Sequence, residues 1–212
     1  LHYPLRRQRQ MCIRDRHINL SIPSYETLSD VFTGIACAFA HSESTVVDIG
    51  CSTGRFLSAL PKCDGCDYLG IDRVKFKDMN KDFSFSLGDA KEILPTVKNV
   101  SVIVSMFCLQ FMGEKKRSEV LEIVKEKIDK GATFLISEKI FLNDPVLQTL
   151  IHRMHIQEKR KSFTDKEILD KDIQLSTSMF CKTEKELVQE LTQIGSVVKV
   201  WQSYNFVGYV VK

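Results

Sequence analysis

The chain has 212 residues, of which 43% are hydrophobic and 27% are charged, and its formal net charge is +3. This balance is typical of one soluble globular domain and excludes collagen-like and disordered chains. Such a small positive excess does not by itself indicate a nucleic-acid surface. The longest apolar runs fall well short of the roughly 20 residues that a membrane helix needs, so we expect no transmembrane segment.

Seven cysteines are scattered along the chain without the spacing of a disulfide framework. Such usage favours a reducing compartment, and we expect the protein in the cytoplasm. Cys63 and Cys66 form a C-x-x-C pair, but a structural zinc site needs two further ligands and the sequence has no second pair. We therefore interpret the pair as part of a turn and expect no metal.

The first 16 residues, LHYPLRRQRQMCIRDR, are rich in arginine and show no apolar periodicity. No hydrophobic segment follows the basic residues, as one would in a signal peptide. The string MCIRDR resembles translated sequencing-adapter sequence, so we expect residues 1–16 to be non-native or disordered. A basic arm for nucleic acid is the alternative. We expect a single domain over residues 17–212.

From residue 45 onward, short apolar segments that favour strands alternate with segments that favour helices. Helical patterns occupy residues 53–60 and 114–129, and the second of them has its apolar residues on one face. The expected parallel strands are 45–49, 67–71, 83–87, 100–107 and 132–138. Alternating strands and helices with short connections predict an α/β fold, with a doubly wound, Rossmann-like parallel sheet.

The region after the fifth expected strand departs from this alternation. Residues 140–180 contain a good helix start at Asp144 and Pro145, followed by a second polar helix. We interpret this region as a helical insertion over the carboxyl edge of the sheet. A helix over residues 182–195 and a hairpin of two further strands complete the chain, so seven strands are expected.

A glycine-containing loop follows the first expected strand, in the stretch VVDIGCSTG. Gly50 and Gly54 there allow a tight turn and close approach of a ligand. The spacing is G-x-x-x-G, which differs from the G-x-G-x-x-G of dinucleotide-binding proteins. A glycine pair alone is weak evidence for a cofactor-binding loop, and a plain strand-to-helix turn is the alternative interpretation.

Three acidic residues strengthen the cofactor interpretation. Asp48 precedes the loop, Asp72 ends the second expected strand, and Asp89 follows the third. An acid at the end of the second strand can accept hydrogen bonds from ribose hydroxyls. Three acids at adjacent strand ends repel a phosphate chain. They suit a cofactor with a ribose, an adenine and a positive centre.

This pattern resembles the class I methyltransferases that depend on S-adenosylmethionine (SAM). VVDIGCSTG is similar to their motif I, LGID to motif II, and GDA to the motif that follows. The resemblance covers about residues 45–139 and the final hairpin. It implies the seven-stranded methyltransferase fold and SAM as the cofactor, and it says little about the substrate.

A closer resemblance covers residues 21–212. The stretches IPSYETL, GCSTG, MFCLQF, ISEKIF, MH with KR, and WQSYNF occur in the order found in the carboxy-SAM synthase family. Those enzymes share the methyltransferase fold and transfer the carboxylate of prephenate to SAM, for a tRNA wobble-uridine pathway. The family is dimeric, which implies a homodimer here.

The resemblance also implies which residues hold the cofactor. Tyr25 would contact it from the N-terminal segment, Asp72 would bind the ribose, and Asp89 would bind the adenine. The full set is Tyr25, Asp48, Gly50, Cys51, Ser52, Gly54, Asp72, Arg73, Asp89, Ala90 and Met106.

Two positions depart from the family pattern. Met106 stands where the family has an asparagine, and Asp172 stands at the position of an arginine expected to hold the extra carboxylate. A carboxylate is repelled by Asp, whereas it pairs strongly with Arg. Carboxyl transfer is therefore disfavoured, although Lys171 or Arg153 could substitute from a neighbouring position.

The candidates for substrate chemistry are fewer. His155 is a candidate catalytic base, and an ordinary helix histidine is the alternative. Phe107, Phe111 and Tyr204 could form an apolar substrate wall or simply pack in the core. A basic cluster in the insertion could meet a tRNA backbone or an acidic substrate, or be a solvated helix face; it comprises Arg153, Lys159, Arg160 and Lys161.

Three functions remain open. The first is a SAM-dependent methyltransferase acting on a small molecule or a tRNA nucleoside. The second is carboxy-SAM synthesis from SAM and prephenate, and the third is a non-catalytic SAM-binding module. The stretch SMFCLQF after the fourth expected strand lacks the N-P-P-Y pattern associated with amino-group methylation of bases, which disfavours an adenine or cytosine N-methyltransferase.

Overall fold

The computed structural model describes residues 18–79 and 82–212. The interpretation of residues 1–16 as non-native falls outside this part of the chain. Residues 18–21 form a helical turn that leads into the first long helix. No helix in the two described ranges has the length and apolar character needed to cross a membrane.

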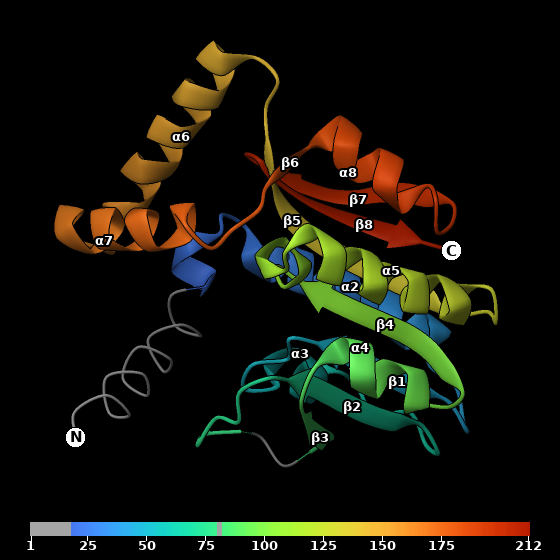
Figure 1. Cartoon of the computed structure of the whole chain (residues 1–212). Helices are drawn as coiled ribbons and strands as arrows, with labels where there is room; N and C mark the ends of the chain where they lie inside the picture. The colour runs from blue at the N-terminus through green and yellow to red at the C-terminus, as the bar shows by residue number, and fades with distance from the viewer. Residues whose placement is uncertain (1–17, 80–81) are drawn as a thin grey trace.

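An open mixed sheet forms the centre of the molecule (Figure 1). Its strand order is β3-β2-β1-β4-β5-β8-β7, with β1 to β5 parallel and β8 antiparallel to both β5 and β7. These strands are β1 Thr45–Ile49, β2 Asp67–Asp72, β3 Ser84–Leu87, β4 Val100–Met106, β5 Thr133–Phe141, β7 Val197–Ser203 and β8 Phe206–Val211. The prediction of a doubly wound sheet with seven strands is confirmed along this path.

An eighth strand, β6 (Lys182–Thr183), pairs in parallel with the end of β5. The sequence pattern instead predicts a helix that starts at residue 182. The difference arises because Thr183 is the N-cap of that helix, and its side chain accepts a hydrogen bond from the Glu186 amide. An N-cap residue has extended backbone, so it can pair with a neighbouring strand.

Helices cover both faces of the sheet, and two further helices project from it. In chain order the helices are α2 Tyr25–Phe39, α3 Arg55–Ala59, α4 Ala90–Ile93, α5 Glu114–Ile128, α6 Pro145–Lys159, α7 Asp165–Ser176 and α8 Glu184–Leu191. Two 3-10 turns are η1 Leu94–Thr96 and η2 Leu109–Phe111. In Figure 1, α4, α5 and α8 lie on one face and α2 and α3 on the other. Each face has its own hydrophobic cluster.

The sequence analysis did not predict α2, although the helix has a clear apolar face. Leu28, Phe32 and Ala36 recur every four residues and are buried. They pack against the sheet at β8, where Gly208 leaves room for them. A Cβ at Gly208 would lie 2.9 Å from the Leu28 Cδ1 atom and 3.3 Å from the Phe32 ring. A side chain at this position would require Leu28 and Phe32 to shift, so Gly208 permits the observed close packing of α2 on β8.

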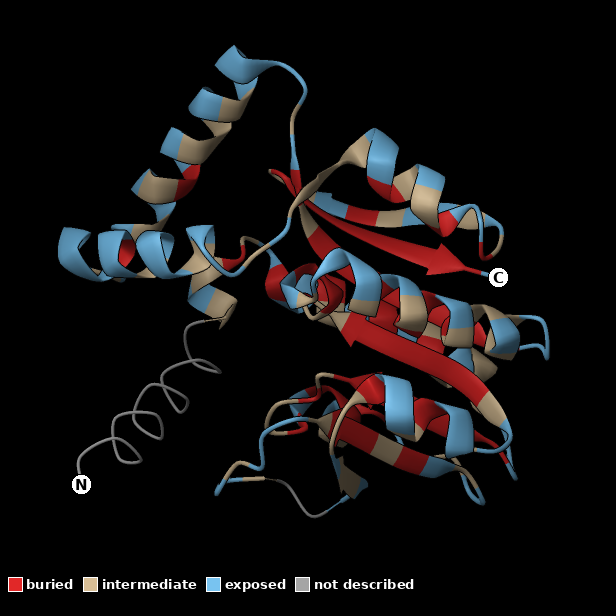
Figure 2. Ribbon diagram, viewed as in Figure 1, coloured by how far each residue is buried: buried red, intermediate tan, exposed pale blue. Residues whose placement is uncertain are grey.

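The predicted insertion is confirmed as two helices, α6 and α7, that follow β5. Asp144 caps α6, because its carboxylate accepts hydrogen bonds from the Val146 and Leu147 amides at 2.8 and 2.9 Å. Thr164 and Glu167 form a capping box at the start of α7. Figure 1 shows the pair projecting from the sheet, and Figure 2 shows that most of its surface is exposed.

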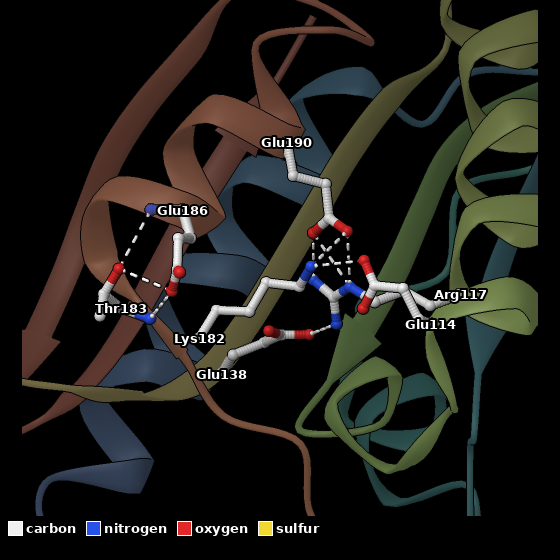
Figure 3. Close-up of polar contacts among 7 residues, drawn as sticks. All are labelled: Glu114, Arg117, Glu138, Lys182, Thr183, Glu186 and Glu190. Carbon is white, nitrogen blue, oxygen red and sulfur yellow. Dashed lines mark hydrogen bonds and ion pairs between the residues drawn. The ribbon is translucent and has the colours of Figure 1, made fainter.

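A buried ion network joins α5 and α8 to β5. The Arg117 guanidinium donates to Glu138 at 2.5 Å and to Glu190 at 2.6 and 2.9 Å, and only 2% of the Arg117 side chain is exposed. Lys182 adds a contact to Glu190 at 3.2 Å (Figure 3). One arginine thus neutralises carboxylates from a central strand and from a covering helix.

Replacing Arg117 by methionine should destabilise the fold strongly, because Glu138 would then be a buried carboxylate without a cation. We expect a loss of about 3–5 kcal/mol in the free energy of unfolding, measured by urea titration. Lys125→Ala is the matched control, since Lys125 pairs with Asp129 at an exposed site and should cost less than about 1 kcal/mol. Equal effects of the two substitutions would contradict this assignment.

Candidate functional site

The carboxyl ends of β1, β2 and β4 bring most of the predicted cofactor residues to one edge of the sheet. Asp48 pairs in register with Gly70 of β2 and Val104 of β4. The loop after β1, the acid that ends β2 and Met106 at the end of β4 therefore lie side by side. Parallel strands place their carboxyl ends at one edge, which is where ligands bind in such sheets.

The loop after β1 turns sharply back over β2. The amides of Gly50 and Cys51 both donate to the Ile71 carbonyl, at 2.8 and 3.2 Å. Gly50, Ser52 and Gly54 have φ of 76°, 52° and 81°, in the left-handed region. Side chains at the two glycines would overlap Cys108 and Phe83 respectively. The glycines are thus needed for the packing of the loop itself, as the plain-turn alternative anticipates.

Asp72 is the acid most firmly tied to this loop. One carboxylate oxygen accepts from the Ser52 amide and the other from the Val74 amide, both at 3.0 Å. A carboxylate has about four acceptor positions, so each oxygen keeps one for a ligand. The contact orients Asp72 at the loop and leaves it able to accept two neighbouring hydroxyl groups.

Asp48 is almost completely buried beneath the same loop. Burial, and to a smaller extent the charge of the nearby Asp72, raise the pKa of its carboxyl group to about 7. When both acids are ionised, they make this edge of the sheet electronegative. A cationic ligand would relieve the repulsion between them, whereas a phosphate group would increase it.

Asp89 is the N-cap residue of α4, directly before the first helical residue, Ala90. Its side chain accepts from the Lys91 amide at 3.2 Å and forms an ion pair with Lys116. These bonds and the charge of Arg73 lower the pKa of Asp89, although burial acts in the opposite direction. Ala90 is buried. Arg73 is thus close enough to Asp89 for its charge to affect the carboxyl group.

Tyr25 and Met106 also meet at this edge. The Tyr25 hydroxyl lies 4.0 Å from the Met106 sulfur, and its ring lies 6.3 Å from that of Phe107. On its other side, the Arg55 guanidinium lies 5.8 Å from the Tyr25 ring centre. Thioether and aromatic groups therefore form an apolar wall where the family pattern has an asparagine amide.

His155 is buried between the insertion and the rest of the chain. Its Nε2 lies 2.6 Å from the Ser21 carbonyl oxygen, and its ring packs edge-on against Phe206 at 5.3 Å. Because a carbonyl only accepts, Nε2 donates, and the neutral ring presents Nδ1 as an acceptor. Burial and the charge of Lys159 lower the pKa of His155 to about 4. The ring is therefore neutral at pH 7 and connects α6 to the N-terminal turn.

The basic residues of the insertion have different environments. Arg160 pairs with Asp165 at 2.7 Å and Lys161 with Glu158 at 2.7 Å, both at exposed positions. Arg153 is also exposed. Lys159 differs, because burial, Lys139 and Lys171 together lower its pKa to about 8, while Asp172 acts in the opposite direction. Lys159 of α6 is thus close enough to Lys139 of β5 and to Lys171 and Asp172 of α7 for their charges to affect it.

The three predicted wall residues separate in the structure. Phe107 is buried, Phe111 is exposed, and Tyr204 is half-buried in the turn between β7 and β8. Phe107 and Tyr204 both have φ of 52°, an uncommon conformation for bulky residues.

Cys63 and Cys66 lie in the turn before β2, with the Cys66 amide bonded to the Cys63 carbonyl at 3.1 Å.

Two polar residues with contacts between distant segments, Arg55 and Gln110, are not among the predicted site residues. Arg55 begins α3 directly after Gly54, and its guanidinium donates to the Asn19 side chain at 2.8 Å. Gln110 is buried, and its side-chain oxygen accepts from the Lys139 amide at 2.7 Å. Gln110 lies within the MFCLQF stretch and could have been suspected there. The Arg55 contact joins residues 36 positions apart, so no local pattern predicts it.

Comparisons with known proteins show which proteins this chain resembles in sequence and in fold. No family model matches the chain. Carboxy-S-adenosyl-L-methionine synthase of Colwellia psychrerythraea is 27% identical over 206 residues, covering 89% of this chain and 84% of the relative. The enzyme of the same name from Idiomarina loihiensis is 28% identical over 207 residues, covering 89% and 84%.

Solved structures extend the comparison to the fold. A TehB-like SAM-dependent methyltransferase from Corynebacterium glutamicum superposes with a TM-score of 0.57 at 14% identity, covering 97% of each chain. Human N-acetylserotonin methyltransferase in complex with SAM gives a TM-score of 0.56 at 14% identity, covering 87% of this chain and 50% of the other. This chain therefore has the class I SAM-dependent methyltransferase fold and is similar in sequence to the carboxy-SAM synthases.

Proposed function

We propose that the protein is a SAM-dependent transferase, most simply a methyltransferase that acts on a small molecule or a tRNA nucleoside. The observation that carries this proposal is the carboxylate of Asp72, held by two loop amides with acceptor positions to spare for the ribose hydroxyls. The electronegative surroundings of Asp48 suit a sulfonium cation. Both features fit SAM better than a dinucleotide, whose pyrophosphate would be repelled.

The proposed cofactor residues surround this edge. Gly50, Cys51 and Ser52 would contact the methionyl part, Asp72 the ribose, and Asp89 the adenine. Asp48, Gly54, Arg73, Ala90, Tyr25 and Met106 would complete the site. SAM when bound supplies an activated methyl group. The protein's part is to orient the acceptor, exclude water and accept a proton where the acceptor needs it.

His155 remains a proposed base for that proton. Since Nε2 donates to the Ser21 carbonyl, Nδ1 would be the accepting atom. The lowered pKa makes it a weak base, which suits an acceptor that ionises readily. The alternative of a histidine that only packs α6 against the N-terminal turn explains the same contacts.

The second candidate, carboxy-SAM synthesis, is favoured by the similarity to the carboxy-SAM synthases and by the lysines near Asp172. Lys159, Lys139 and Lys171 could together replace the missing arginine as partners of a carboxylate. The test is mass spectrometry of SAM incubated with the protein and prephenate. A prephenate-dependent gain of one carboxylate would establish this reaction and displace methyl transfer as the leading function.

The third candidate is a SAM-binding module without activity. The nucleoside that co-purifies with residues 17–212 separates these functions, when it is released by denaturation and identified by mass spectrometry. SAM or S-adenosylhomocysteine (SAH) supports a methyltransferase, and carboxy-SAM supports the second function. SAM binding without turnover on any acceptor supports the third.

We further propose a cytoplasmic protein with a place in tRNA modification, as the resemblance implies. The described part of the chain contains six cysteines, all with free thiols. This agrees with a reducing compartment.

We also propose a homodimer, formed by the exposed apolar side chains of α6 and α7. Val146, Leu147, Leu150 and Met154 lie on α6, each at least 48% exposed, and α7 adds Leu169 and Ile173. Such a patch marks an interaction surface.

Leu150→Asp should therefore convert the protein from dimer to monomer, because a carboxylate in the centre of an apolar interface is costly to bury. Light scattering coupled to size-exclusion chromatography measures the mass. Val198→Asp is the control, since Val198 is equally exposed but lies on β7. A monomeric wild-type protein, or a dimer that survives Leu150→Asp, would refute the interface.

Asp72→Ala should weaken SAH binding by about 1–3 kcal/mol, the scale of hydrogen bonds to a charged group. This corresponds to roughly 5- to 150-fold in the dissociation constant. Titration calorimetry on the folded variant gives the number. Asp67→Ala, at the exposed opposite end of β2, should bind SAH as the wild type does, and unchanged affinity in Asp72→Ala would refute the ribose assignment.

The preference for SAM over SAH should increase as the pH rises through about 7. Above that pH Asp48 is ionised and attracts the sulfonium charge, which SAH lacks; below it the carboxyl group is neutral. We expect the ratio of the two dissociation constants to change about fivefold or more between pH 6 and 8. Asp48→Asn should remove the change, and a ratio independent of pH in the wild type would contradict it.

A further inference from the structure

A cavity of about 400 Å³ lies between the N-terminal turn, the end of α6 and the turn between β7 and β8. Asn19 and Ser24 line it from the first of these, and His155 and Glu158 from the second. Tyr204 closes it from the third. Its volume is within the range of small-molecule sites.

Flat side chains form one wall of this cavity. The Tyr204 ring lies 6.2 Å from the His155 ring, which in turn packs against Phe206. Tyr204 is only half-buried, so part of its ring is open to the cavity, whereas His155 is 4% exposed and held by Ser21. A rigid aromatic wall of this kind favours a flat ring stacked upon it.

The polar groups of the cavity carry no net charge. Glu158 and Lys161, both at its rim, pair with each other at 2.7 Å, and the buried His155 is neutral at pH 7. Hydroxyls of Ser24 and Ser162 add groups that can both donate and accept. The lining therefore favours a neutral ligand with a polar edge over an anion or a hydrocarbon.

Backbone strain occurs at the same place. Ser24 and Tyr204 have φ of 58° and 52°, and both line the cavity. Left-handed conformations cost free energy in residues other than glycine, and they persist where surrounding contacts hold them, often at ligand sites. In this case they turn Ser24 and Tyr204 toward one space.

The cavity is connected to the proposed cofactor loop through one side chain. Arg55, which follows Gly54, donates to Asn19 in the cavity wall at 2.8 Å and lies against the Tyr25 ring. Tyr25 directly follows Ser24. The two sites thus share a wall made by the N-terminal turn.

We infer that this cavity binds the acceptor as a flat, neutral heteroaromatic ring of nucleoside size, stacked on Tyr204 with its polar edge toward Ser24 and Ser162. This inference rests on the proposed transferase function, because an acceptor site adjoining the cofactor loop is what such an enzyme requires. It applies to transfer of a group from SAM to a separate acceptor, since in carboxy-SAM synthesis SAM itself is the acceptor.

Uridine and 5,6-dihydrouridine test it directly, because they share the same hydrogen-bonding edge but only uridine has an aromatic ring. Each is titrated into the full chain, with and without saturating SAH, and cytidine serves as a second aromatic probe. We expect uridine or cytidine to bind and dihydrouridine to bind roughly 5- to 150-fold more weakly, the range of base–aromatic stacking.

Tyr204→Leu keeps a bulky apolar side chain and removes the ring. It should abolish the preference for uridine over dihydrouridine and leave SAH binding unchanged. Phe180→Leu removes an exposed ring outside the cavity and should preserve the preference. If Tyr204→Leu does not fold, Ser162→Ala serves as the second variant. It should weaken the binding of both uridine and dihydrouridine, because a polar contact is lost.

The outcomes separate the two proposals. SAH binding without uridine or cytidine binding overturns the inference and leaves the transferase function standing. Equal affinity for uridine and dihydrouridine, or a preference that survives Tyr204→Leu, also overturns it. Aromatic binding in the absence of any SAH binding supports the cavity and overturns the proposed function.

Discussion

The buried guanidinium of Arg117 holds two helices, α5 and α8, against the sheet. It is buried between Glu138 of the central strand β5 and Glu190 of α8, and it is itself part of α5. Three elements far apart in the sequence are therefore held by a single guanidinium. Lys139 directly follows Glu138 near the carboxyl end of β5, from which the chain leads into the insertion. The Arg117–Glu138 ion pair therefore holds the end of the strand that precedes the insertion.

The parallel sheet and the acids at its edge could be predicted because their signals are local. The apolar segment that ends at Asp72 and the alternating segment before Asp89 indicate strands that end at a binding edge, and the structure has both strands within one residue of the predicted bounds. The glycine loop was also evident, although Gly50 and Gly54 are required by Cys108 and Phe83 as much as by any ligand.

The rest of the site could not be predicted because it depends on contacts between distant segments. Arg55 meets Asn19 across 36 residues, and His155 meets Ser21 across 134. The environment of Asp172 could not be predicted either, since the sequence shows the missing arginine but not that Lys159 of α6 lies close enough to Asp172 for their charges to interact. Burial and pairing of charges appear only once the chain has folded.

Gly208 has a consequence for how the protein is made. Helix α2 rests on this glycine, yet β8 follows every other element of the described chain. While the ribosome is still extending the chain, the apolar face with Leu28 and Phe32 has no strand to cover it. Early segments of such a chain are exposed to chaperones and to self-association until synthesis reaches β8. The order of translation, and not only the final packing, therefore determines how safely this fold is reached.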